Sequence, residues 1–206
     1  MPIPLTPEGE LWILSANGTP YWPDNPQPEN ISLRVIAQSL AQKVRFGGHG
    51  RPFYSVAQHA VFVANIVIEL GGGKRAALHG LMHDAHEAWL VDLPSPLKKQ
   101  PAIHGWWTEM ERRWDDVIFD TLEIPDNPFI RNQVKFADSV ALVIEGPVLM
   151  PAPPADWEWL GGYGASDPDT MLAADIARNI EGSPAHSIWA WKEAEKQFLN
   201  WWDDLR

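Results

Sequence analysis

Imidazole and carboxylate side chains recur in stretches of this sequence that are otherwise apolar. The segment LMHDAHEAWLVDLPSPLK, residues 81–98, brings a His-Asp pair and a Glu together among leucine, alanine and tryptophan. A carboxylate in apolar surroundings is costly unless it is paired. A divalent cation held between helices would satisfy such groups, and a mixed set of imidazoles and carboxylates suits Mn²⁺, Fe²⁺, Co²⁺, Ni²⁺ or Zn²⁺. The candidate ligands are His59, His83, Asp84 and Asp138.

The elements that position these ligands are predicted to be helices, because apolar residues recur at helical spacing around each ligand. Ser55 is the expected N-cap of the helix that carries His59, and the glycines at 71–73 are expected to end it. Ser183 and Pro184 are expected to begin the last helix, as cap and first residue. The predicted helices span residues 31–46, 55–70, 74–90, 104–122, 127–146 and 183–206.

An all-α architecture with a small β element near its start follows from this pattern. The Asn17-Gly18 pair favours a hairpin turn within an N-terminal extension, residues 1–30. A long connection and the last helix make up residues 147–206. We interpret residues 1–206 as a single domain, because this length is sufficient for one full hydrophobic core.

The composition limits the class of protein. The sequence has no cysteine, which excludes disulfides and thiolate metal sites. The formal net charge of −11 argues against a nucleic-acid-binding surface but is compatible with one pocket for a single nucleotide. No signal peptide and no apolar run of membrane-spanning length is recognised, so a cytoplasmic protein is expected. The 12 tryptophans need a core or an interface, and those in NWW, residues 200–202, favour a homo-oligomer.

The order of the candidate ligands resembles the H…HD…D signature of the HD-superfamily metal-dependent phosphohydrolases. The resemblance is closest to the small bacterial and phage 5′-deoxynucleotidases and deoxynucleotide triphosphohydrolases, in which a Glu and an Asp-Leu-Pro-x-Pro-x-Lys run follow the HD pair. Glu87 and DLPSPLK, residues 92–98, match this pattern here. RFGGHGRPFYSVAQHA, residues 45–60, resembles the Arg-aromatic pair that precedes the first metal-binding His of that branch. The likeness covers residues 33–146 and implies an HD-domain helical bundle that binds a divalent ion (Co²⁺, Mn²⁺, Zn²⁺, Mg²⁺ or Fe²⁺).

The resemblance also implies roles for individual residues. Glu87 would orient or deprotonate a water beside the cation. Asp92 would protonate or position the leaving 5′ oxygen, unless it only caps the turn before the prolines. Arg45 offers a guanidinium fork for phosphate oxygens, the alternative being a surface or helix-end role. Further candidate substrate contacts are Phe46, His49, Arg51 and Lys98.

Two further histidines near the pair leave alternatives open. His79 and His83 are four residues apart, which is the spacing of a zinc pair on one helix face. His86 follows His83 by three residues, and either histidine would extend the site to a second metal. Because the branch that the sequence resembles does not require them, we expect both to lie behind the ligands or on the surface.

The leading functional expectation is a metal-dependent 5′-deoxynucleotidase that releases phosphate from deoxynucleoside monophosphates. A phage-type triphosphohydrolase, which would release triphosphate from a deoxynucleoside triphosphate, shares every ligand and stays as an alternative. A nucleotide-binding module with an inactive HD site is an alternative of another class. A cyclic-dinucleotide phosphodiesterase is disfavoured, because Gly162-Tyr163 is followed by Gly164 where those relatives have proline.

Overall fold

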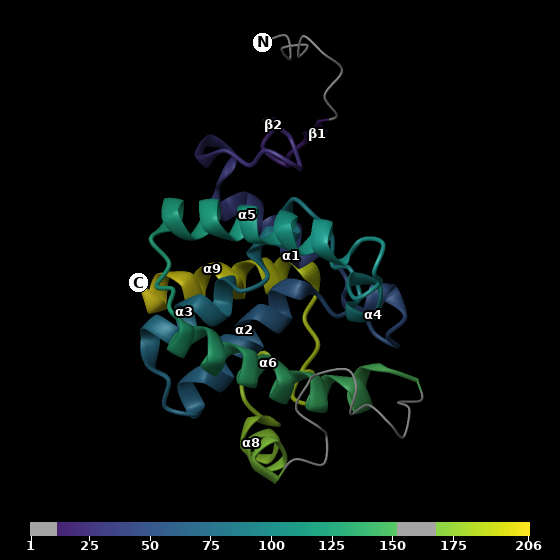
Figure 1. Ribbon diagram of the computed structural model, residues 1–206. Helices are drawn as coiled ribbons and strands as arrows, with labels where there is room; N and C mark the ends of the chain where they lie inside the picture. Colours follow the sequence, from purple (N-terminus) through teal and green to yellow (C-terminus); the bar gives the residue numbers. More distant parts are fainter. Residues whose placement is uncertain (1–11, 152–167) are drawn as a thin grey trace.

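Residues 12–151 and 168–206 are described by the computed structural model, and most of them lie in helices (Figure 1). The predicted all-α class is confirmed. The α-helices are α1 Leu33–Gln42, α2 Val56–Glu69, α3 Gly73–Met82, α4 Ser95–Lys98, α5 His104–Leu122, α6 Pro128–Leu149, α8 Pro168–Ala177 and α9 Trp191–Leu205. Short 3₁₀ turns are η1 Pro28–Asn30, η2 Arg45–Gly48 and η3 Ala85–Ala88.

The predicted hairpin is present near the N-terminus. Strands β1 Ile13–Leu14 and β2 Pro20–Tyr21 pair antiparallel, with Ile13 opposite Tyr21. Gly18 in the connecting turn has a φ of 81°, a conformation that glycine adopts without strain. Tyr21 then packs edge-on against Trp114 of α5, with the ring centroids 5.8 Å apart. The hairpin is therefore attached to the helical body through an aromatic contact.

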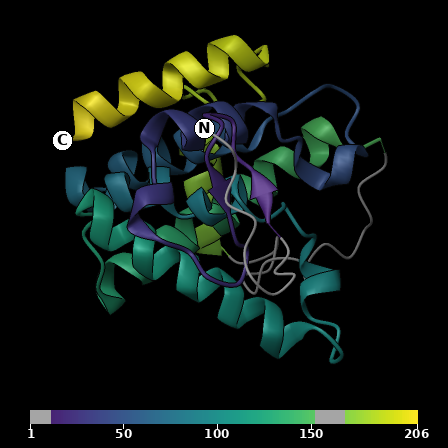
Figure 2. The same ribbon diagram turned by 90° about the horizontal axis from the view of Figure 1, so that it is seen from above.

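Helix α2 forms the centre of the core. Every residue from Val56 to Val67 is buried, so the helix is surrounded by other elements on all sides. It packs against α1, α3, α6 and α9, and α8 lies against α6 (Figure 1). Viewed after a quarter turn, α9 runs along one edge of the molecule towards the C-terminus (Figure 2). None of the described helices is long and apolar enough to cross a membrane.

The third predicted helix ends earlier than expected. The apolar pattern predicted one helix over residues 74–90, but α3 ends at Met82 and the chain continues as a turn into η3. Asp84 has a φ of −105° and a ψ of 17°, which are not helical values. Periodicity alone does not show this change, because a 3₁₀ turn keeps apolar residues at almost the same spacing as an α-helix. The prolines of DLPSPLK do lie outside α3, as predicted.

The C-terminal third also differs from the prediction. Helix α6 does not stop at Gly146 but runs to Leu149 with Pro147 inside it. Helix α9 begins at Trp191, so the predicted start at Ser183 is wrong. The hydroxyl of Ser183 instead donates to the carbonyl oxygen of Arg178 at 2.6 Å, within a turn. The predicted connection contains α8, while its residues 152–167 lie outside the described part of the chain.

Candidate metal centre

His59 lies in the first turn of α2, and its side chain is fully buried. The hydroxyl of Ser55 accepts a hydrogen bond from the backbone N–H of Gln58 at 3.1 Å, which confirms the predicted N-cap. The cap fixes where α2 begins, and so it fixes the direction in which the His59 ring leaves the helix. This ring points towards the turn after α3 and towards α6, since it lies close to both His83 and Asp138.

His83 and Asp84 occupy the turn that follows α3. Nδ1 of His83 lies 2.7 Å from the carbonyl oxygen of Gly80. A carbonyl oxygen only accepts hydrogen bonds, so Nδ1 carries the proton and Nε2 keeps its lone pair. The early end of α3 therefore presents Nε2 of His83 and the adjacent Asp84 carboxylate together.

The four predicted ligands come together. Oδ1 of Asp138 lies 3.2 Å from Nε2 of His59. Oδ2 of Asp84 lies 3.2 Å from Nε2 of His83 and 3.6 Å from Nε2 of His59. The ligand atoms of His59, His83 and Asp138 all lie within 4.8 Å of one another, which is compatible with one bound cation. The predicted assembly of these residues from three separate segments is thus present in the fold.

The imidazole nitrogens of this cluster have the protonation pattern of metal ligands. Nδ1 of His59 lies 2.7 Å from a carboxylate oxygen of Glu145, so Nδ1 donates and Nε2 is the nitrogen left to bind a cation. Nε2 of His59 and Nε2 of His83 are buried and have no hydrogen-bond partner within the described residues. Each faces a carboxylate oxygen, and such a pair of atoms needs a proton or a cation between them. The donor set of imidazole nitrogens and carboxylate oxygens fits a divalent ion.

The charges of the cluster also favour a bound cation. Burial opposes protonation of His59, but the Glu145 and Asp138 carboxylates outweigh it and raise the pKa of His59 to about 10. Burial also opposes ionisation of Asp84 and Asp138, but the neighbouring imidazoles hold the pKa of each carboxyl below its ordinary value. In the metal-free protein a proton on His59 therefore takes the position that a cation would occupy.

Glu145 is a member of the site that the sequence did not single out. It lies on α6, two turns beyond Asp138, and its side chain is fully buried. Its carboxylate accepts from Nδ1 of His59 at 2.7 Å and from the hydroxyl of Tyr54 at 2.9 Å, and Nη2 of Arg45 lies 3.1 Å from it. The only signal in the sequence was a lone carboxylate in the apolar run ALVIEGPVLM.

Glu87 lies beside the ligand cluster and is 2% exposed. One of its oxygens is within 4.8 Å of ligand atoms of Asp84 and His86, and its Oε2 has no hydrogen-bond partner within the described residues. Burial raises the pKa of Glu87 to about 8, and the Asp84 and Asp92 carboxylates add to the shift. Nζ of Lys98 lies 3.9 Å from Oε1 of Glu87. A carboxyl with this pKa can exchange a proton near neutral pH.

The other predicted catalytic and substrate-binding residues surround this cluster. Asp92 is half-buried, and burial raises its pKa, with Arg45 and Asp84 among the charges that act on it. The guanidinium of Arg45 lies between Glu145 and Asp84 and 5.4 Å from the Phe46 ring. Phe46 has a φ of 57°, which is unusual for a residue with a side chain.

The remaining predicted contacts are more peripheral or differently paired. His49 is exposed, and Arg51 donates to the carbonyl oxygen of Pro151. Nζ of Lys98 lies 2.8 Å from Oε1 of Glu111 on α5, so this cation is already paired. The substrate roles of all these residues stay predictions.

The two additional histidines have different surroundings. Nδ1 of His79 lies 3.0 Å from the carbonyl oxygen of Pro125, and the ring packs on Phe119. His79 is thus directed away from His83 despite the spacing of a zinc pair. Nδ1 of His86 lies 2.8 Å from Oδ1 of Asp115, and Nε2 lies 3.6 Å from Glu111, so both nitrogens face α5. His86 is thus paired with carboxylates of α5, while one of its nitrogens also lies within 4.8 Å of ligand atoms of Asp84 and Glu87, and its place behind the ligands stays a prediction.

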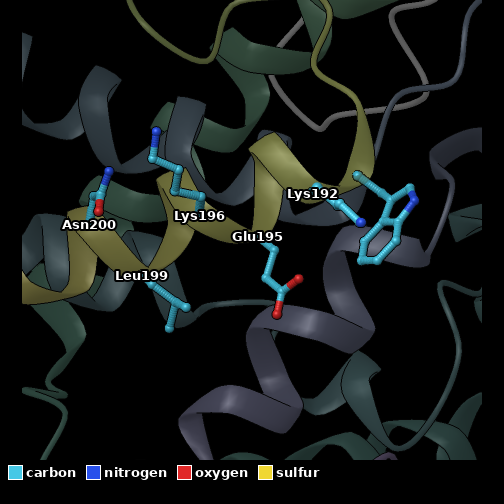
Figure 3. A pocket seen from close by; sticks show the side chains of 6 residues that line it. Lys192, Glu195, Lys196, Leu199 and Asn200 are labelled. Carbon is cyan, nitrogen blue, oxygen red and sulfur yellow. The ribbon is translucent and has the colours of Figure 1, made fainter.

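A separate groove of about 410 Å³ lies along α9 (Figure 3). All its lining residues, among them Trp191, Glu195 and Leu199, belong to α9, so it shares no residue with the metal cluster. Of the late tryptophans that favoured a homo-oligomer, Trp202 belongs to the core and Trp201 packs partly buried against it. The homo-oligomer stays a prediction.

Known proteins include relatives that are similar to this chain in sequence. No protein-family model matches the sequence. The chain is 36% identical over 134 residues to the uncharacterized protein YfdR of Escherichia coli, covering 65% of this chain and 70% of YfdR. The chain belongs to the YfdR family. It is also 29% identical over 167 residues to the uncharacterized protein RCAP_rcc00048 of Rhodobacter capsulatus, covering 78% of this chain and 82% of that protein. The name of YfdR states no activity, so the proposed chemistry rests on the residues of the site.

Proposed function

We propose that this member of the YfdR family is a divalent-metal-dependent phosphohydrolase of the HD type that acts on (deoxy)nucleotides, with a deoxynucleoside 5′-monophosphate as its substrate. The observation that carries the proposal is the convergence of Nε2 of His59 and Nε2 of His83, both without a hydrogen-bond partner within the described residues, with the carboxylates of Asp84 and Asp138. The same ordered set, followed by Glu87 and DLPSPLK, is what the sequence shares with HD phosphohydrolases.

The cation, when bound, would polarise a phosphoryl oxygen and lower the pKa of a neighbouring water. His59, His83, Asp84 and Asp138 would hold it. The side chain of His59 is fully buried and those of His83 and Asp84 are mostly buried, while the side chain of Asp138 is 45% exposed, so the site is open to substrate on the side of Asp138. These residues also match the preference of Mn²⁺, Co²⁺, Fe²⁺ or Zn²⁺ for mixed nitrogen and oxygen ligands.

Glu87 is the proposed general base. Its raised pKa, about 8, keeps it able to take a proton from an attacking water at neutral pH and to release it afterwards. Lys98, 3.9 Å from the same carboxylate, supports the ionised form. Asp92, whose pKa burial also raises, is the proposed donor to the leaving 5′ oxygen. The two carboxyls divide the base and acid roles in this proposal.

A monophosphate suits the charges of the site better than a triphosphate. Arg45 is paired with Glu145, and Lys98 is paired with Glu111, so neither cation is free to neutralise a polyphosphate tail. The ligand carboxylates and Glu87 add negative charge next to them. A tail of two further phosphates would then meet repulsion that neither Arg45 nor Lys98 is free to offset. This favours the nucleotidase over the triphosphohydrolase.

The proposal is tested with a panel of substrates and metals. Purified protein is incubated with deoxynucleoside and ribonucleoside mono-, di- and triphosphates in Mn²⁺, Co²⁺, Mg²⁺ or Zn²⁺, and the product is identified as phosphate or triphosphate. We expect phosphate release from monophosphates, abolished by a chelator and reduced at least about 100-fold by Asp84→Ala or Glu87→Gln.

The matched control is Asp116→Ala, which removes an exposed carboxylate on α5 that pairs with Arg112, and which should keep full activity. Release of triphosphate would replace the nucleotidase by the triphosphohydrolase. Nucleotide binding without turnover of any substrate, in protein that binds metal, would overturn the enzyme proposal in favour of a binding module.

A further inference from the structure

We propose that Glu145 is the positioning residue of this centre: it fixes the proton of His59 on Nδ1 and holds Arg45 against the same ligands. The inference rests on the proposed function in one respect, because it takes His59 as a metal ligand. It adds a residue that lies outside the ligand set and outside the HD signature. It also explains why the sequence keeps a carboxylate in the apolar second half of α6.

The burial of Glu145 shows that its partners are essential. Its side chain has no solvent exposure, and an isolated carboxylate at such a position would cost several kcal/mol. The imidazole of His59, the hydroxyl of Tyr54 and the guanidinium of Arg45 surround it. All three can donate a hydrogen bond, and the positive charge of the guanidinium stabilises the ionised carboxylate. Glu145 is therefore an ionised acceptor.

An ionised acceptor on one ring nitrogen determines the role of the other. A neutral imidazole can carry its proton on either nitrogen, and only one form presents a lone pair from Nε2. Because Oε1 of Glu145 accepts from Nδ1 of His59 at 2.7 Å, the proton stays on Nδ1. Nε2 then faces Asp138, 3.2 Å away, where a cation would bind in place of a proton. A carboxylate in this position also makes the imidazole a better ligand.

The second oxygen of Glu145 connects the ligand to the candidate substrate contact. Oε2 of Glu145 lies 3.1 Å from Nη2 of Arg45, while Nη1 of Arg45 lies 3.9 Å from Oδ2 of Asp84. One carboxylate thus orients a metal ligand with one oxygen and the guanidinium with the other. Loss of Glu145 should disturb metal binding and phosphate binding together. A residue that only filled space would not do this.

Glu145→Gln is the informative variant. An amide accepts hydrogen bonds through one oxygen only, so it cannot serve His59 and Arg45 at the same time. We expect the affinity for Mn²⁺ alone, measured by calorimetry, to fall about 10- to 100-fold. In metal-free protein, NMR of nitrogen-labelled histidine should show a proton on Nδ1 of His59 that is protected from exchange, and Glu145→Gln should remove this protection.

Tyr54→Phe is the matched control, because it removes a hydrogen bond from the same carboxylate and leaves Nδ1 of His59 bonded. It should keep the Mn²⁺ affinity within about threefold and the protected proton unchanged. Glu145→Asp, which keeps the charge on a shorter side chain, should recover part of the affinity. If Glu145→Gln does not fold, the Nδ1 proton of the wild-type protein and the Glu145→Asp affinity still test the proposal.

The outcomes separate this inference from the proposed function. An Mn²⁺ affinity and a protected Nδ1 proton that are both unchanged in folded Glu145→Gln would overturn the role of Glu145, whatever the activity. Wild-type protein that binds Mn²⁺ through a protected His59 but hydrolyses no nucleotide would overturn the proposed function and leave Glu145 in its role.

Discussion

Nδ1 of His86 lies 2.8 Å from Oδ1 of Asp115, and this contact attaches η3 to α5 one residue before Glu87. Nε2 of the same ring lies 3.6 Å from Oε1 of Glu111. Burial opposes protonation of His86, but Asp115 and Glu111 outweigh it and hold the pKa of His86 well above its usual value. The ring is therefore charged, with a hydrogen bond from Nδ1 to Asp115 and an ion pair between Nε2 and Glu111, and it fixes the segment that carries the proposed general base.

Replacing His86 by alanine should lower both stability and activity. The change removes the hydrogen bond to Asp115 and the ion pair with Glu111, and it loosens η3. We expect a loss of about 1–3 kcal/mol in the free energy of unfolding, measured by urea denaturation. The reference variant is Asp116→Asn, next to Asp115 but exposed and paired with Arg112, which should cost less than about 0.5 kcal/mol. Equal effects of the two changes would show that His86 does not fix η3.

Metal binding should strengthen as the pH rises. The pKa of His59 is raised to about 10 in the metal-free protein, so a cation has to displace its proton across the neutral range. Titration with Mn²⁺ at pH 6, 7 and 8 should show affinity rising by up to about tenfold per pH unit. An affinity independent of pH in this range would remove His59 from the ligand set.

The proton on His59 also makes the stability of the metal-free protein depend on pH. A raised folded pKa means that the contribution of protonated His59 is complete below the unfolded pKa of about 6.5 and is lost as the pH rises through about 10. Metal-free protein should therefore weaken on the alkaline side. Bound metal, which replaces the proton, should reduce this loss in thermal denaturation between pH 7 and 10.

Glu87→Gln should change stability in a pH-dependent way. The folded pKa of Glu87 is raised from 4.5 to about 8, so the protein prefers the protonated carboxyl and loses stability as the pH rises from 4.5 to 8. Glutamine imitates the protonated form and does not titrate. In metal-free protein the variant should gain on the wild type by up to about 1.4 kcal/mol per pH unit in this window. Parallel stability curves for the two proteins would contradict the raised pKa.

Gly182 should not tolerate a side chain. Its φ is 89°, and a Cβ atom there would lie 2.7 Å from the backbone N and Cα of Phe62 in α2. Gly182→Ala should therefore cost at least about 2 kcal/mol by backbone strain and overpacking, and it should loosen the C-terminal segment that Gln58 binds. Gly105→Ala is the comparison, since Gly105 is in α5 with open space around it and should gain about 0.5–1 kcal/mol.

The sequence determined much of this protein by itself. Helical spacing of apolar residues predicted the all-α class and the bounds of α5, and the Asn17-Gly18 pair predicted the hairpin. These features depend on local residue preferences and on the spacing of apolar residues, and both can be read directly from a sequence. The candidate ligands were also found, because a His or Asp within an apolar helix is costly without a partner.

Only the tertiary structure decided where α3 ends and which distant residues pair, because the spacing of apolar residues carries no information on either. Helix α3 ends at Met82 because the chain turns there to present His83 and Asp84, while the apolar pattern continues unchanged through η3. Likewise, the pairing of Lys98 with Glu111, and of Glu145 with His59, joins residues from distant segments. A carboxylate becomes a partner only when packing brings a donor within hydrogen-bond distance, and the order of residues along the chain does not contain that distance.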